Sequence, residues 1–194
     1  KLILIATEDI ASRSHDNWSF VIDRNLKDQF FVRDEFRLND NLFISNIKVS
    51  AKQILPTTGL SRIGQTNGSY IFASPKQMLE FVATSPAEKH AKAITTTGAI
   101  TVPNYSTDKW MSQRTSYIAT HDHVMGGLIV EIVDNRVFHF RHFQANHQGE
   151  FIDLGVCYKP DGSTEKVRTH MYAGDLHSGH VDDEAFDATM ALCK

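Results

Sequence analysis

The sequence predicts a sheet-rich chain of the α+β or α/β class. Its 194 residues are 41% hydrophobic and 22% charged, which is an ordinary composition for a globular protein. Short apolar runs of strand length recur along the chain, and turn residues separate many of them. Helix signals are fewer, and the clearest lie near residue 74 and near residue 182. This length suits one full-sized domain or two small ones.

Most of the strands predicted in the first half are short. Residues 1–6 form an apolar run that is typical of a buried strand. Residues 42–49 alternate imperfectly between apolar and polar side chains, which predicts a half-buried strand with an irregularity. Two more strands are predicted at residues 70–73 and 93–97. The segment 23–36 mixes charges with phenylalanines, and its type stays open.

Turn and helix signals separate these strands. Residues 56–59 contain proline and glycine and are expected to break regular structure, and residues 64–69 (GQTNGS) are predicted as a turn or loop. Ser74 can cap a helix, with a proline directly after it, and Gln77 completes a capping box. The apolar residues of the segment 78–82 would then supply the buried stripe of this helix.

The second half begins with a polar excursion and then turns to strands. Residues 104–115 are expected at the surface, and residues 134–135 and 160–162 are predicted turns. The acids at residues 182–184 favour a helix N-terminus, and apolar residues come after them at helical spacing. Strands are predicted at residues 127–133, 137–143, 151–158 and 166–173.

Charge and cysteine content exclude several classes. The chain has 20 basic and 23 acidic residues, so a sequence-wide electrostatic attraction to nucleic acid is not indicated, although a local basic patch is allowed. Cys157 and Cys193 form no CxxC pattern, which argues against a disulfide framework and a cysteine zinc site. We therefore expect a reducing compartment, the cytoplasm. Because no run approaches 18 apolar residues, no membrane span is expected.

Histidines direct the functional search to the second half, because eight of the ten lie between His121 and His180. His121 and His123 flank an aspartate and could bind a metal or act in acid–base catalysis, but we favour a polar turn at the start of a strand. Arg141 could contribute to a phosphate-binding face, and we favour the solvated face of a sheet. Residues 95–98 (TTTG) could offer hydroxyls to a phosphate, but they do not form a P-loop.

The segment around Asp175 and His177 carries the most specific signal. A predicted strand leads into Gly174, and an acid-capped helix is predicted shortly after. In extended chain these two side chains project to the same side, so a carboxylate and an imidazole can bind one cation. This donor pair suits Mn, Fe or Zn, and suits Mg less well. The alternative is that the pair caps the final helix, although the acids at 182–184 already supply that role.

A strand followed by Gly174-Asp175-Leu176-His177, a loop and a helix resembles the opening motif of the calcineurin-like metallophosphoesterases. The resemblance implies that Asp175 and His177 bind one ion of a two-metal centre, with Mn most suitable. That centre would activate water to hydrolyse a phosphate ester or the phosphodiester of a nucleic acid such as DNA. The sequence of residues 95–105 and the stretch after it resembles phage-encoded members, for which the location would be the host cytoplasm.

The family's later motifs, Gly-Asp-x-x-Asp and Gly-Asn-His, do not occur in these 194 residues. The resemblance therefore implies the N-terminal part of a longer enzyme. Residues 1–165 would be an α+β domain, and residues 166–194 would begin the catalytic domain.

These patterns lead to three functional hypotheses. The leading hypothesis is the N-terminal part of a metal-dependent phosphoesterase, a nuclease. The second is a non-catalytic module that binds nucleic acid or protein, in which Arg141 rather than Asp175 contacts the partner. The third, ranked last because no HExxH helix is present, is a zinc hydrolase that uses His121 and His123.

Overall fold

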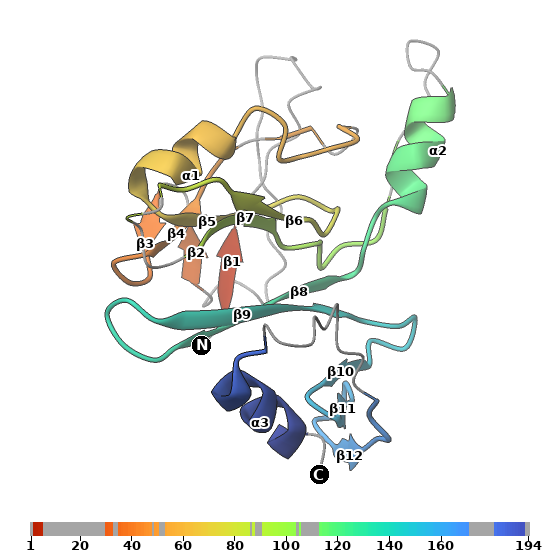
Figure 1. Ribbon diagram of the computed structural model, residues 1–194. Helices are drawn as coiled ribbons and strands as arrows, with labels where there is room; N and C mark the ends of the chain where they lie inside the picture. The colour runs from red at the N-terminus through yellow and green to blue at the C-terminus, as the bar shows by residue number, and fades with distance from the viewer. Residues whose placement is uncertain are drawn as a thin grey trace. The chain divides into compact units, whose positions relative to one another are not determined.

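The computed structural model describes residues 2–5, 30–32, 35–47, 49–50, 53–85, 87, 91–103, 105, 113–170 and 181–192. These residues form two compact units, Lys1–Asn146 (unit 1) and His147–Lys194 (unit 2). Both helices and strands are present, and the main sheet is mixed, so the predicted α+β class is confirmed (Figure 1). The domain boundary predicted near residue 165 stays a prediction. Among the described helices, none has both the length and the apolar character needed to cross a membrane.

Unit 1 is built on a five-stranded sheet in the order β3-β4-β5-β7-β6. Strands β4, β5 and β7 are parallel, while β3 and β6 are antiparallel to their neighbours at the two edges. A short parallel pair, β1 and β2, and an antiparallel ribbon, β8 and β9, complete the unit. Its strands are β1 (Ile3–Ile5), β2 (Phe30–Val32), β3 (Phe36–Arg37), β4 (Leu42–Ser45), β5 (Ser69–Phe72), β6 (Leu79–Val82), β7 (Lys92–Thr96), β8 (Gly126–Ile132) and β9 (Phe138–Gln144). Its helices are α1 (Ser61–Asn67) and α2 (Gln113–His121).

The sheet of unit 1 has a buried cluster on each face, because successive side chains of a strand point to opposite sides. On one face, Leu42, Ile44 and Ile71 pack with Val32, and apolar side chains of the β8–β9 ribbon cover them. On the other face, Phe72, Val82 and Ile94 form the second cluster, with Leu60 at the start of α1 packed against it. Figure 1 shows α1 on one side of the sheet and the ribbon on the other.

The described residues of unit 2 form a three-stranded antiparallel meander and, after it, a helix. The meander consists of β10 (Phe151–Asp153), β11 (Val156–Tyr158) and β12 (Thr164–Lys166), and the helix is α3 (Asp183–Leu192). Leu154 and Gly155 join β10 to β11 with φ of 46° and 78°. Two positive φ values are required in a two-residue hairpin turn of type I′, which explains the glycine.

Several sequence predictions are confirmed in unit 1. The short strands predicted at residues 1–6, 70–73 and 93–97 correspond to β1, β5 and β7. The alternating pair 127–133 and 137–143 forms the β8–β9 ribbon, with Asp134 accepting turn hydrogen bonds from the backbone N–H groups of Arg136 and Val137. The strand predicted over 42–49 is shorter than expected, because β4 ends at Ser45.

The turn predicted at residues 64–69 was wrong for most of that segment. Residues 61–67 are helix α1, whose N-terminus at Leu60 has no side-chain cap and so offers no capping signal. Gly64 lies inside this helix because α1 packs closely on the sheet. A Cβ at Gly64 would lie 2.9 Å from Cγ2 of Val82, so any larger residue here would force α1 or Val82 to shift.

The helix predicted to start at Ser74 was also wrong. Ser74 Oγ does accept a hydrogen bond from the backbone N–H of Lys76, at 3.3 Å, but the chain then enters strand β6. The Met78 N–H donates to the Thr96 hydroxyl at 2.8 Å, and the Met78 carbonyl accepts a hydrogen bond from the Thr96 N–H at 3.0 Å. Pairing with the buried strand β7 therefore overrides the local capping pattern.

Three corrections apply to the later segments. The single strand predicted over 151–158 is a hairpin of two strands, β10 and β11. The strand predicted over 166–173 ends at Lys166, because residues 167–170 are not in a strand, and 171–173 lie outside the described residues. Residues 104–115 were predicted as an irregular surface segment, but helix α2 already begins at Gln113. The helix predicted after residue 182 is confirmed as α3.

Candidate functional site

The candidate site of unit 1 lies where the parallel strands β5 and β7 end. The loop after β5, the loop after β7 and the segment between α2 and β8 are hydrogen-bonded to one another. Val124 N–H donates to Pro75 C=O at 2.8 Å, and Ala99 N–H donates to Val124 C=O at 2.9 Å. Open sheets with parallel strands place their ligand sites at this edge, so the side chains here are the first candidates for function.

An ion pair between a buried lysine and a partly exposed aspartate stabilises this edge. Nζ of Lys76 lies 2.9 Å from Oδ2 of Asp122, and the Lys76 side chain is only 6% exposed. The hydrogen bond from Lys76 lowers the pKa of Asp122, and a second hydrogen bond, from His121, lowers it further. An ionised Asp122 therefore compensates the buried ammonium group, and the pair joins the β5 loop to the end of α2.

Two polar side chains attach the β8–β9 ribbon to the sheet. Nε2 of Gln77 lies 3.1, 3.2 and 2.8 Å from the carbonyl oxygens of Thr97, Gly127 and Phe143, so its two hydrogens are shared among three acceptors. His142 on β9 donates from Nε2 to the Thr96 carbonyl at 2.7 Å, with Thr95 Oγ1 also 3.0 Å away. These contacts fix backbone positions, which is a structural role.

The threonines of the predicted phosphate segment 95–98 bind backbone carbonyls instead. Their hydroxyls donate to Met78, Lys76 and Gly98 at 3.0, 2.5 and 2.7 Å. A hydroxyl group has one hydrogen to donate, so these hydroxyls are not available as donors to a phosphate. Thr95 and Thr96 are also fully buried.

His121 and His123 have different partners and do not converge on one position. His121 is exposed, with Nδ1 3.1 Å from Oδ1 of Asp122. His123 has Nδ1 at 2.9 Å from the hydroxyl of Tyr105 and Nε2 at 2.6 Å from the carbonyl of Thr101. Since both ring nitrogens of His123 are engaged, metal binding by His123 would require one of these bonds to break.

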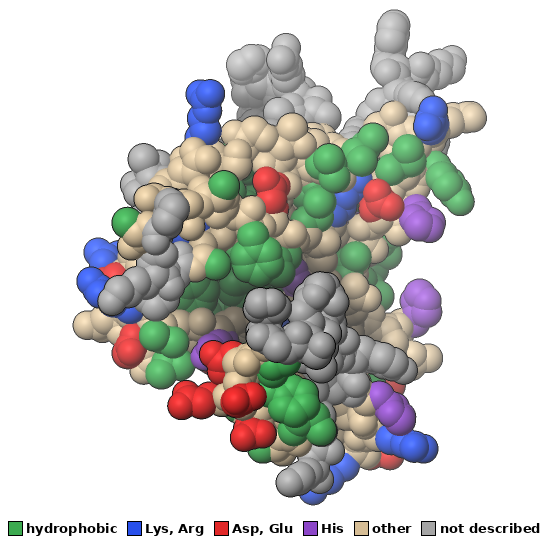
Figure 2. All heavy atoms as spheres, in the orientation of Figure 1, with side chains coloured by type: hydrophobic (Ala, Val, Ile, Leu, Met, Phe, Trp, Pro, Cys, Tyr) green, Lys and Arg blue, Asp and Glu red, His purple; other side chains and the backbone are tan. Residues whose placement is uncertain are grey.

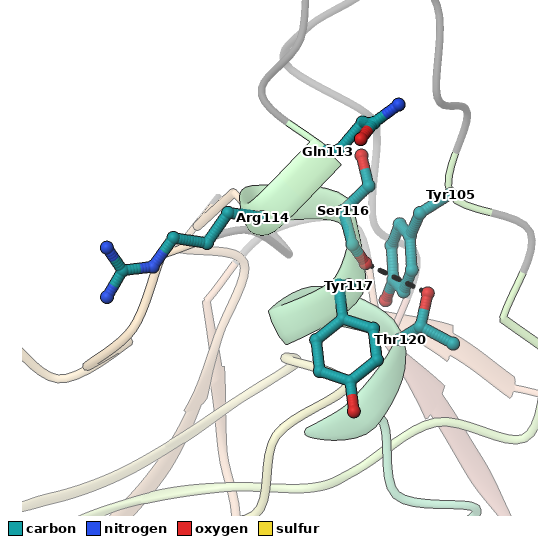
Figure 3. A pocket seen from close by; sticks show the side chains of 6 residues that line it. All are labelled: Tyr105, Gln113, Arg114, Ser116, Tyr117 and Thr120. Carbon is teal, nitrogen blue, oxygen red and sulfur yellow. Dashed lines mark hydrogen bonds between the residues drawn. The ribbon is translucent and has the colours of Figure 1, made fainter.

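A shallow pocket opens between Tyr105 and helix α2. The residues that line it are Tyr105, Gln113, Arg114, Ser116, Tyr117 and Thr120. Figure 3 shows the Tyr105 ring beside the part of α2 that carries Ser116 and Thr120, whereas Arg114 extends away from Tyr105. The hydroxyl of Thr120 donates to the Ser116 carbonyl at 2.9 Å. These described residues supply two phenols, a guanidinium group, an amide and two aliphatic hydroxyls, and no carboxylate is among them.

Arg141 is engaged on the ribbon. Its Nη1 lies 2.8 Å from Oε2 of Glu131 on the neighbouring strand, and its side chain is 25% exposed. The ion pair neutralises the charge that a phosphate would need, so Arg141 receives little support as a phosphate-binding residue.

Asp175 and His177, the predicted metal ligands, lie outside the described residues. The described chain resumes at residue 181. There, Asp182 is the N-cap of α3, and its Oδ1 accepts a hydrogen bond from the Ala185 N–H at 2.9 Å. Figure 2 shows acidic side chains gathered over α3. Within the described part of the chain, no three His, Cys, Asp or Glu side chains are grouped so that they could hold a metal ion.

Sequence reasoning missed three residues of this region. Tyr105 lies in a stretch that the sequence marks only as polar, and nothing local indicates that it meets His123. Lys76 and Gln77 fall within the wrongly predicted helix, so their contacts with Asp122 and with the ribbon carbonyls were not foreseen. These contacts join segments 18 to 66 residues apart, beyond the range of any local pattern.

Comparisons of the chain with protein-family models, with curated proteins and with solved structures found no match. The functional argument therefore depends on the residues and their chemistry.

Proposed function

We propose that the chain is the N-terminal part of a divalent-metal-dependent phosphoesterase, a nuclease that hydrolyses phosphodiester bonds. The observation that carries the proposal is the sequence Gly174-Asp175-Leu176-His177 placed shortly before a capped helix. In the metallophosphoesterases that this motif resembles, a loop and a helix come after the Asp and the His. Helix α3 supplies that element, and its cap is Asp182.

Asp175 and His177 would be the metal ligands of this chain. A carboxylate oxygen and an imidazole nitrogen form a donor set that fits Mn²⁺, with Fe or Zn also suitable and Mg less so. When bound, the metal would polarise a phosphoryl oxygen and lower the pKa of a bound water. Asp182 is a poor third ligand because one of its oxygens already caps α3. Two protein ligands hold an ion weakly, so we expect weak binding and no turnover by the 194-residue chain.

Manganese binding to the chain tests the proposal. The bound ion can be followed by electron paramagnetic resonance during a titration with Mn²⁺. We expect Asp175→Ala and His177→Ala each to weaken binding by about tenfold or more, as the loss of a metal ligand should. The matched control is His121→Ala, which removes an exposed histidine of unit 1 and should leave binding unchanged. Equal binding by all four proteins would overturn the assignment of the ligands.

Hydrolysis tests the second part of the proposal. The chain is expected not to cleave bis(4-nitrophenyl) phosphate in the presence of Mn²⁺. If the chain does hydrolyse the ester and Asp175→Ala abolishes this activity, the assignment of Asp175 as a metal ligand is supported. The expectation that this chain is only part of the enzyme would then be wrong.

A further inference from the structure

Tyr105 and His123 meet because two segments of unit 1 run side by side. Ala99 and Met125 form a parallel bridge, and the Gly126 N–H donates to the Ala99 carbonyl at 3.0 Å. Beyond this bridge His123 lies between Thr101 and Tyr105, with 2.6 Å to the carbonyl and 2.9 Å to the hydroxyl. The two rings are also in edge contact, with centroids 5.8 Å apart at 62°.

The Thr101 carbonyl determines which nitrogen of neutral His123 carries the proton. A carbonyl oxygen only accepts, so at 2.6 Å it requires a proton on Nε2. The Nδ1 lone pair is then left to accept the hydroxyl proton of Tyr105. A hydroxyl, a base and a group that orients the base are the three parts of an activated nucleophile.

The phenol of Tyr105 also lines the α2 pocket, where a reactant could approach it (Figure 3). Among the described residues that line the pocket there is no carboxylate, so none of them repels an anionic group, and the side chain of Arg114 extends away from Tyr105. Gln113 offers an amide donor on the same helix. This lining favours a phosphoryl ester as the class of reactant.

We propose that Tyr105 and His123 form a nucleophile–base pair that reacts with phosphoryl esters in the α2 pocket. The phenolic oxygen of Tyr105 forms a bond to phosphorus, and the bond from phosphorus to the leaving oxygen breaks. The phenol proton passes to Nδ1 of His123 and from there to solvent, while the leaving oxygen, on the opposite side of phosphorus, takes up a proton from water, so the step balances. The proposed reaction uses neither Asp175 nor His177, and it goes beyond the proposed metal-dependent activity.

Tyr117 and His121 provide a matched control within the same chain. Tyr117 lines the same pocket and is 71% exposed. Its ring stacks on His121, with centroids 6.3 Å apart at 28°, while Nδ1 of His121 faces Asp122. If exposure determined reactivity, Tyr117 would react faster than the half-buried Tyr105; if the base determined it, Tyr105 would react faster.

The test is labelling of the chain with diisopropyl fluorophosphate, with peptide mass spectrometry over time. The probe places a phosphoryl group on the phenol and releases fluoride, and the proton leaves through His123 to the buffer. We expect Tyr105 to be labelled at least about tenfold faster than Tyr117, as assistance by a positioned base implies. Equal rates, or faster labelling of Tyr117, would overturn the proposal.

Variants separate a base from a structural contact. His123→Ala should reduce the labelling rate of Tyr105 to that of Tyr117, and added imidazole should restore it, whereas His121→Ala should change neither rate. His123→Gln can still donate to Thr101 but cannot accept a proton, so it should also lose the fast labelling if His123→Ala proves to be unfolded by circular dichroism. Fast labelling of Tyr105 in a folded His123→Gln protein would show that His123 is not the base.

Discussion

The two compact units of this protein bury their side chains very differently. In unit 1 the central sheet is covered on both faces, and side chains such as Leu42, Phe72 and Ile94 are at most 1% exposed. In unit 2 the described residues, 147–170 and 181–192, include none that is buried. The comparison indicates that packing positions the polar residues of unit 1, whereas turns and caps define the local structure of unit 2.

The largest expected effect is loss of core packing in unit 1. Phe72→Ala should lower the free energy of unfolding by about 3–5 kcal/mol, because Phe72 is fully buried beside Val82 and Ile94. The matched control is Phe81→Ala on the edge strand β6, where the side chain is 69% exposed and the loss should stay below about 1 kcal/mol. Urea denaturation measures both, and similar losses would contradict the assignment of the core.

A smaller effect is expected from the ion pair at the sheet edge. Asp122→Ala leaves the buried ammonium of Lys76 without this carboxylate and should cost about 2 kcal/mol at pH 7, below the value for a fully buried pair because Asp122 is 36% exposed. Lys76→Met removes the buried charge itself and should cost less. If Lys76→Met proves the more damaging change in urea denaturation, the lysine has a role besides this pair.

The same pair predicts a dependence on pH. Hydrogen bonds from Lys76 and then His121 lower the pKa of Asp122 below its ordinary value of 3.8. A lowered pKa in the folded state means that the contribution of Asp122 is complete above the ordinary pKa and is lost as the pH falls through the folded-state pKa. The stability difference between the wild type and Asp122→Ala should therefore decrease below about pH 4. A difference that stays constant down to about pH 2 would contradict this.

In unit 2 the cap of α3 should matter more than any side-chain burial. Asp182→Ala removes the acceptor of the Ala185 N–H and should destabilise α3 by about 1 kcal/mol. Hydrogen exchange of the α3 amides measures this, while exchange in β7 should stay unchanged. Asp187→Ala, at an exposed position inside the helix, is the control and should have a smaller effect. Equal effects would mean that charge rather than capping stabilises α3.

The smallest effect is expected at the hairpin turn of unit 2. Leu154 has φ of 46°, a left-handed conformation that leucine adopts at a cost, whereas asparagine adopts it readily. Leu154→Asn should slow hydrogen exchange in β10 and β11 by an amount equivalent to about 0.5–1 kcal/mol. Leu154→Ala keeps the unfavourable backbone and should change little. An equal gain from both variants would place the effect in the leucine side chain, which is 76% exposed.

How much the sequence could predict depended on the distance between interacting residues. The alternation of Phe138, His139 and Phe140 and the turn at Asp134 come from neighbouring residues, and the ribbon was predicted with bounds close to those observed. The start of α3 was predicted for the same reason, because the acids at its N-terminus act on backbone groups only a few residues away. Gly64, by contrast, lies where a helix packs closely on the sheet, and in the sequence a glycine at such a position cannot be distinguished from a turn glycine.

The candidate site shows the same division more strongly. His121 and His123 were recognised as candidates from their residue type and spacing alone. Their partners Asp122, Tyr105 and Thr101 were not assigned, because loops that meet only in the folded chain determine which nitrogen faces which group.

The sequence alone determined the strand-rich class, the turns at residues 134–135 and 160–162 and the start of the last helix, because apolar periodicity, turn residues and capping act within a few neighbouring residues. Only the tertiary structure decided that the capping pattern at Ser74 leads into strand β6 and that His123 lies against Tyr105. The physical reason is energetic. A local propensity is worth about 1 kcal/mol or less per residue, whereas pairing with a buried strand combines several hydrogen bonds with apolar burial.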